Sequence, residues 1–122
     1  MNRHEYRVKI VFALYQSLLL KKDLELSFND NFENDNNEYL LVLKKDLIEN
    51  YKLYIDEITP LLTKWTFDRL SYVEQAILLV ATSEIKTKVI NKNIAIDEAV
   101  IIAKEYCDEE SYKYINGVLD KL

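Results

Sequence analysis

The sequence predicts an all-α fold, a compact single-domain helical bundle of about six or seven helices over residues 1–122. Gly117 is the only glycine and Pro60 the only proline, whereas β-sandwiches and barrels depend on many tight turns, which glycine usually makes. Apolar residues also recur at helical spacing along most of the chain. A chain of this length suffices for one hydrophobic core.

The N-terminal half contains two long predicted helices. Apolar side chains at helical spacing predict the first over about 4–22 and the second over about 37–58. Pro60 ends or kinks the second helix. Segment 23–37 between them, DLELSFNDNFENDNN, is acidic and rich in Asn. We therefore expect a mobile loop there. A short turn around 24–28 within this loop is left as an alternative.

The C-terminal half predicts three more helices. A short helix or connector, LLTKWTFDRL, precedes them and contains the only tryptophan. Ser71 and Glu74 fit a capping box that opens a helix over about 71–87, and the run AILLVA makes this the expected buried helix of the bundle. The polar stretch KVINKN is followed by helices expected near 96–106 and 109–121.

The dipeptide Asn116-Gly117 lies inside the last predicted helix, although it usually marks a tight turn. Because the apolar spacing continues through it, we infer a helical Gly117 that permits the close approach of another helix. Its cost is about 1 kcal/mol relative to alanine. A glycine without any packing role is the alternative.

The formal net charge is −5, but the charge is unevenly distributed. Segment 23–38 holds six acidic residues and no Lys or Arg, whereas residues 1–9 hold Arg3, Arg7 and Lys9 against Glu5. Local charge decides whether a phosphate backbone is attracted. The acidic total therefore argues against a general nucleic-acid binder, and the N-terminus is the locally basic exception.

Composition excludes most catalytic chemistry. His4 is the only histidine and Cys107 the only cysteine, so neither a zinc cluster nor an intramolecular disulfide is expected. No motif around His4 and Cys107 indicates that they form a nucleophile pair, and a glycine-rich phosphate-binding loop cannot form from one glycine. We predict no enzyme, no catalytic residue, no metal and no cofactor. A lone thiol, no apolar run of membrane length and no signal peptide predict a cytoplasmic protein without membrane contact.

Two groups of residues are candidates for nucleic-acid binding. Arg3, His4 and Arg7 share one face at the start of the first helix and could follow a phosphate backbone. A solvated helix end is the alternative. In the last helix Lys113 lies between two tyrosines, a pattern that suits unpaired bases stacked on rings with a cation at the phosphate. A solvated lysine between core tyrosines is the alternative.

From residue 60 onward the chain resembles a known family. The densest match is AIDEAVIIAKEYCDEESYKYINGVLDKL, preceded by WTFDRLSYVEQAILLVATSEI, and near the N-terminus RHEYRVKIVFALYQ resembles a basic first helix that ends in Leu-Tyr-Gln. These motifs are similar to those of the NusB family of bacterial transcription antitermination factors. The resemblance covers about 1–20 and 60–122, and 21–59 matches only in being helical.

The resemblance implies a compact all-α fold and a role without chemistry. A member would pair with NusE, a small-subunit ribosomal protein, and bind single-stranded boxA RNA in the antitermination complex of RNA polymerase, notably on ribosomal RNA operons. It implies partner binding by Tyr15 and Glu74, whose plain alternatives are a core aromatic and a helix cap. The RNA-binding positions that it implies are Arg3, His4, Arg7, Glu110, Ser111, Lys113 and Tyr114.

The chain also departs from the family pattern. His4 stands where an arginine is common, and no basic tail precedes it. This thinner basic motif puts more weight on the partner to supply positive charge. Two alternatives stay open: a NusB-like protein-interaction module without independent RNA binding, and an accessory to an RNA-modifying enzyme.

Overall fold

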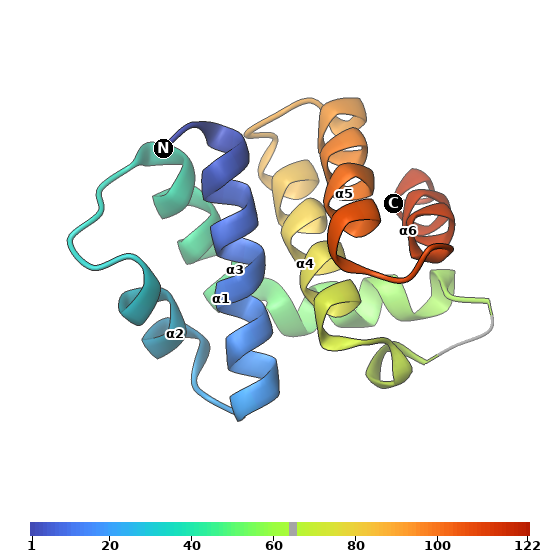
Figure 1. Cartoon of the computed structure of the whole chain (residues 1–122), viewed down its shortest axis with the longest axis horizontal. Helices are drawn as coiled ribbons and strands as arrows, with labels where there is room; N and C mark the ends of the chain where they lie inside the picture. Colours follow the sequence, from blue (N-terminus) through green and yellow to red (C-terminus); the bar gives the residue numbers. More distant parts are fainter. Residues whose placement is uncertain (64–65) are drawn as a thin grey trace.

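The computed structural model describes residues 1–63 and 66–122, and within them six α-helices and two short 3₁₀ helices form an all-α fold without β-strands. The predicted fold class is confirmed (Figure 1). In chain order the elements are α1 (Arg3–Leu20), α2 (Leu24–Asn31), α3 (Glu38–Ile58), η1 (Thr59–Leu61), η2 (Phe67–Arg69), α4 (Tyr72–Thr87), α5 (Lys92–Tyr106) and α6 (Ser111–Asp120).

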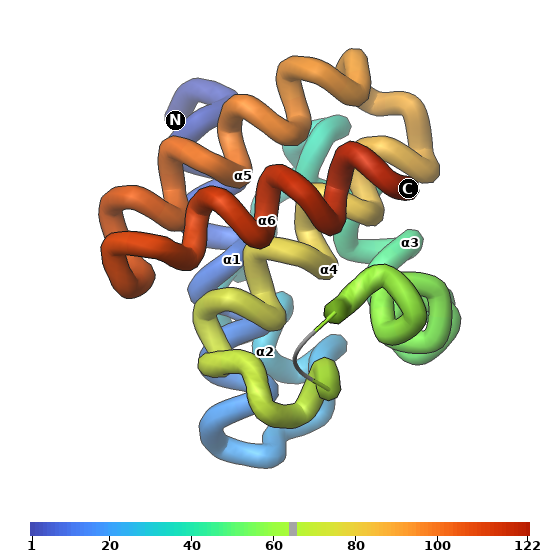
Figure 2. The backbone as a smooth tube through the Cα atoms, turned by 90° about the vertical axis from the view of Figure 1, so that its right-hand side faces the viewer, coloured from blue at the N-terminus to red at the C-terminus, as the bar shows by residue number. Residues whose placement is uncertain are grey.

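Helix α4 is the centre of the bundle. It packs against α1, α3, α5 and α6, while α2 packs against α1 and, to a smaller extent, α3. Figure 2 shows α5 and α6 side by side along one face of the molecule, and these two helices are in extensive contact. The N-terminal half therefore covers one flank of α4, and the C-terminal pair covers the other.

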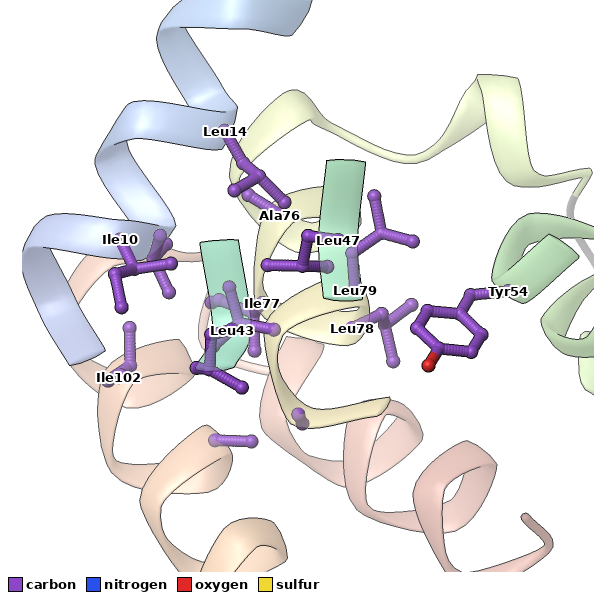
Figure 3. Packing of buried hydrophobic residues seen from close by; sticks show 14 of the residues in the cluster. Ile10, Leu14, Leu43, Leu47, Tyr54, Ala76, Ile77, Leu78, Leu79 and Ile102 are labelled. Carbon is purple, nitrogen blue, oxygen red and sulfur yellow. The ribbon is translucent and has the colours of Figure 1, made fainter. Parts of the chain in front are cut away.

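The core forms because α4 is apolar on nearly all sides. All residues from Gln75 to Glu84 are buried, as the run AILLVA predicted. Figure 3 shows Ile77 and Leu78 among side chains from α1, α3 and α5, including Ile10 and Leu43. Complete burial of an aliphatic side chain of this size contributes about 2 kcal/mol, so this cluster provides much of the stabilisation of the fold.

Capping side chains define where the helices begin. The predicted capping box of Ser71 and Glu74 is confirmed at α4, and Asn2 forms a second capping box with Glu5 at α1. Asn91 caps α5, so that helix begins about one turn earlier than the apolar spacing indicated. The Asn91 side-chain oxygen accepts a hydrogen bond from the backbone N–H of Asn93, a contact that hydrophobic periodicity does not indicate.

Segment 23–37 is largely helical, so the expectation of a loop is wrong for most of it. Asp23 caps α2 by accepting a hydrogen bond from the backbone N–H of Leu26. Phe28 is fully buried, and the Ser27 hydroxyl donates to the carbonyl of Ala13 in α1 at 2.5 Å. Tertiary packing of one face therefore outweighs the polar composition of the segment.

Two other expectations concern single residues. The close helix approach inferred for Gly117 is wrong, because a Cβ added there would meet no described atom within 4 Å. Gly117 is helical, as expected. Trp65, in the predicted connector, lies outside the described residues.

Candidate functional site

The candidate residues lie at three places in the fold. Arg3, His4 and Arg7 occupy the first turns of α1. Glu110, Ser111, Lys113 and Tyr114 surround the start of α6, Tyr15 lies farther along α1, and Glu74 lies in the first turn of α4.

Arg7 is buried, so the exposed position expected for it is wrong. Its Nε donates to both carboxylate oxygens of Glu84 at 3.0 Å, and its Nη2 donates to Glu84 Oε2 at 2.7 Å. The two side chains are only 3% and 1% exposed. Burial opposes the charge of the guanidinium, but the hydrogen bond and charge of Glu84 outweigh it, and the pKa of Arg7 is raised. This bidentate pair joins α1 to α4.

Glu98 of α5 contacts two of the three N-terminal candidates. Its Oε2 lies 3.1 Å from His4 Nδ1, and its Oε1 lies 3.4 Å from Arg7 Nη1. Glu98 remains 22% exposed and His4 42% exposed. His4 and Glu98 therefore form a pair at the surface, which contacts the buried pair of Arg7 and Glu84 through Arg7.

Arg3 is exposed and is held against an aromatic ring. Its guanidinium carbon lies 4.8 Å from the ring centroid of Tyr39 in α3, and that of Arg7 lies 5.6 Å from the same centroid. Burial raises the pKa of the Tyr39 phenol, so the ring stays neutral at physiological pH. Cation–π attraction thus orients Arg3 without neutralising its charge.

The start of α6 presents an exposed cation. Lys113 Nζ lies 3.0 Å from Glu110 Oε2, and both side chains are mostly exposed. The hydrogen bond that Lys113 donates to the Glu110 carboxylate raises the pKa of Lys113. Tyr112 is half-buried, and Lys104 Nζ lies 4.6 Å from its ring centroid. Lys104 of α5 therefore lies against an aromatic ring of α6, and Lys113 directly follows that ring in sequence.

Ser111 and Glu74 are joined directly, although they belong to different predicted sets. Glu74 Oε1 accepts the backbone N–H of Ser71 at 2.9 Å, while its Oε2 accepts the Ser111 hydroxyl at 2.8 Å. Both side chains line a hollow of about 780 Å³, together with the half-buried Tyr114. The capping box was visible in the sequence, but its link to Ser111 was not.

Tyr15 belongs to a group of aromatic side chains on the surface. Its ring lies 5.9 Å, edge to face, from that of Phe12, which lies 4.9 Å from that of Tyr106 in α5. Tyr15 also lines a shallow hollow with Tyr72 and Val73 from α4. Edge-to-face contacts fix the orientation of these rings, and the group presents an apolar face with phenol groups.

Sequence reasoning missed Glu84, Glu98 and Tyr39. One signal was available: Glu84 follows a long run of apolar and small residues in the helix expected to be buried, and a buried carboxylate requires a cationic partner. The sequence did not indicate which cation that would be. No described helix is both long enough and apolar enough to cross a membrane.

Comparison with known families matches residues 1–122 to the NusB family. The chain belongs to the NusB family. The resemblance carried by its C-terminal motif is thereby confirmed. NusB-family membership extends through segment 21–59 as well, which the sequence motifs had matched only as helical.

Relatives named transcription antitermination protein NusB match almost end to end. That of Oceanobacillus iheyensis is 36% identical over 124 residues, covering 100% of this chain and 98% of the relative. That of Bacillus thuringiensis is 37% identical over 128 residues, covering 100% and 97%.

Two solved structures share the NusB fold. The structure described as T. maritima NusB superposes with a TM-score of 0.89 at 31% identity, covering 99% of this chain and 89% of that one. A chain from a crystal structure described as a plectonemic RNA supercoil has a TM-score of 0.82 at 26% identity, covering 98% and 94%.

Proposed function

We propose that this NusB-family chain is a non-enzymatic transcription antitermination factor that binds boxA RNA together with the ribosomal protein NusE, within the antitermination complex of RNA polymerase. The match to the NusB family over residues 1–122 carries this proposal. The names of the relatives support the antitermination role, and the neighbour from the RNA supercoil structure accords with a relation to RNA.

The surface where α5 and α6 meet supports an RNA contact. Lys104, Tyr112 and Lys113 combine cations with an aromatic ring, the arrangement that suits single-stranded RNA. Lys113 is exposed, and its partner Glu110 is a surface residue that a phosphate can replace. We assign the phosphate contact chiefly to Lys113 and place Ser111 and Tyr114 beside it as supporting residues.

At the other end of the chain, Arg3 is the best-placed of the three N-terminal candidates. It is exposed, and the ring of Tyr39 orients it. Arg7 acts indirectly in this proposal, because its guanidinium holds α1 against α4 and α5. His4 resembles Arg3 in lying at the surface, but it resembles Arg7 in being paired with a glutamate, Glu98.

The proposed NusE contact involves Tyr15 and Glu74. Tyr15 belongs to an apolar surface group, and Glu74 presents a carboxylate at the edge of the hollow beside α6. Because this chain is acidic, with a net charge of −5, we propose that NusE supplies part of the positive charge that holds RNA.

One observation favours a second candidate, a protein-interaction module without independent RNA binding. Arg7, His4 and Lys113 each lie beside a glutamate of the same chain. Intramolecular pairing of this kind lowers the positive potential available to a phosphate backbone.

Fluorescence anisotropy of a labelled boxA-containing RNA distinguishes the two candidates. We expect tight binding only when NusE is present, and the binding constant should fall as salt rises. Undetectable RNA binding with NusE present, alongside normal NusE binding, would establish the second candidate.

Single substitutions test which residues contact RNA and which contact NusE. Lys113→Gln should weaken RNA binding about three- to tenfold and reduce the salt slope by about 0.7, the value for one phosphate of a single strand. Lys45→Gln removes the same charge from an exposed position of α3 and should have little effect. Glu74→Ala should weaken NusE binding, with circular dichroism as the check on the fold.

A further inference from the structure

The basic face at the start of α1 is largely neutralised from within the molecule. The positive charges of Arg3 and Arg7 are matched by the carboxylates of Glu84 and Glu98, both of which contact Arg7. Glu5, exposed in the same helical turn, adds another negative charge. The charges of Arg3 and Arg7 are therefore offset by neighbouring carboxylates, which lowers the attraction of this face for a phosphate.

The two carboxylates that contact Arg7 differ in how they meet the solvent. Glu84 is 1% exposed and accepts three hydrogen bonds from Arg7, so it is committed to the interior. Glu98 is 22% exposed, lies 3.1 Å from the half-exposed His4, and comes from a different helix, α5. A phosphate bound at His4 would therefore lie close to the negative charge of Glu98.

We propose that Glu98 limits the RNA affinity of this chain by opposing phosphate at the start of α1. This inference rests on the proposed function, which it deepens by naming a residue that tunes the RNA contact. Glu98 occupies the surface position that a phosphate oxygen would take between His4 and Arg7. Charge repulsion at this point lowers the contribution of α1 and leaves the contact at α6 dominant.

The test compares Glu98→Gln with the wild-type chain, each in complex with NusE, for affinity toward a boxA-containing RNA at about 0.1 M salt. The glutamine keeps an acceptor oxygen for the His4 ring and removes only the charge. Two unit charges roughly 7 Å apart in water interact strongly enough to change affinity about threefold. We expect RNA binding to tighten by about that factor, and the gain to disappear near 1 M salt, where the Debye length is about 3 Å.

Glu49→Gln is the matched control. It removes the same charge from an exposed position of α3, a helix that contributes none of the proposed RNA contacts. Glu49 lies ten residues beyond Tyr39, about 15 Å along the helix axis and more than a Debye length at 0.1 M salt. Its RNA affinity should stay within about 1.5-fold of the wild type.

The outcomes separate this inference from the function on which it rests. Equal or weaker RNA binding by a folded Glu98→Gln variant, with the wild type binding normally, would overturn the inference alone and leave Glu98 as a structural partner of Arg7. An equal gain in Glu49→Gln would overturn it too, because total charge would then explain the effect. A wild-type complex that binds no RNA would overturn the proposed function and this inference together.

Discussion

Replacing Arg7 with methionine should destabilise the bundle itself. The guanidinium makes three hydrogen bonds to Glu84, at 2.7, 3.0 and 3.0 Å, where the two side chains are only 3% and 1% exposed. In Arg7→Met the carboxylate of Glu84 stays buried without its counter-charge. Loss of one partner of a buried ion pair costs about 3–5 kcal/mol.

Urea unfolding followed by circular dichroism measures this loss. For a chain of this size, the dependence of the unfolding free energy on urea is about 1.5–2 kcal/mol per molar. The midpoint of Arg7→Met should therefore fall by about 2 M. The double variant Arg7→Met/Glu84→Leu removes both charges and should regain most of the loss, because well-packed apolar residues can replace a buried pair at little cost.

Two results would refute this reasoning. A midpoint within about 0.5 M of the wild type in Arg7→Met would mean that the pair is not a buried, energetically coupled unit. A double variant no more stable than either single variant would mean that the cost comes from lost packing and not from an unpaired charge. Lys9→Met, at an exposed position of the same helix, should leave the midpoint nearly unchanged.

Two further predictions concern α6 and the single cysteine. Gly117→Ala should raise the unfolding free energy by about 1 kcal/mol, because the position is helical and an added Cβ meets no described atom within 4 Å; a lowered thermal midpoint would contradict this. Burial raises the pKa of the Cys107 thiol to about 11, so alkylation of the folded chain by iodoacetamide should be slow near neutral pH and accelerate only toward pH 11. Since the ordinary value is 9.0, this residue's contribution to stability is complete below about pH 9 and is lost as the pH rises through 11; an alkylation midpoint near pH 9 in the folded chain would contradict the burial.

The sequence predicted the helical elements where apolar periodicity and local caps agree. The helix beginning after Ser71 is the clearest case, because its capping box and apolar run both lie within a few residues of one another. The prediction from sequence failed at α2. There the composition favoured a loop, but Phe28 and Phe32, four residues apart, pack on the core. Aromatic side chains one helical turn apart were the better signal there.

The candidate site was less predictable, because its important contacts join residues distant in sequence. Arg7 and Glu84 are 77 residues apart, and His4 and Glu98 are 94 apart. Helical spacing placed Arg7 with Arg3 on one face but did not indicate that Arg7 is buried against Glu84 of α4 and Glu98 of α5. The local sequence around a charged residue gives no information about neighbours that are distant in sequence, so the exposure of Arg7 was overestimated.

The carboxylate of Glu74 has a consequence for how the chain moves. The start of α6 has no side-chain cap of its own, and Ser111 reaches instead to the same carboxylate that caps α4. One anion therefore stabilises the positive ends of two helical dipoles, although Glu74 and Ser111 are 37 residues apart in sequence. Any ligand that moves the whole Glu74 carboxylate breaks both hydrogen bonds and weakens both first turns together, so the fraying of α4 and the fraying of α6 are thermodynamically linked through this side chain.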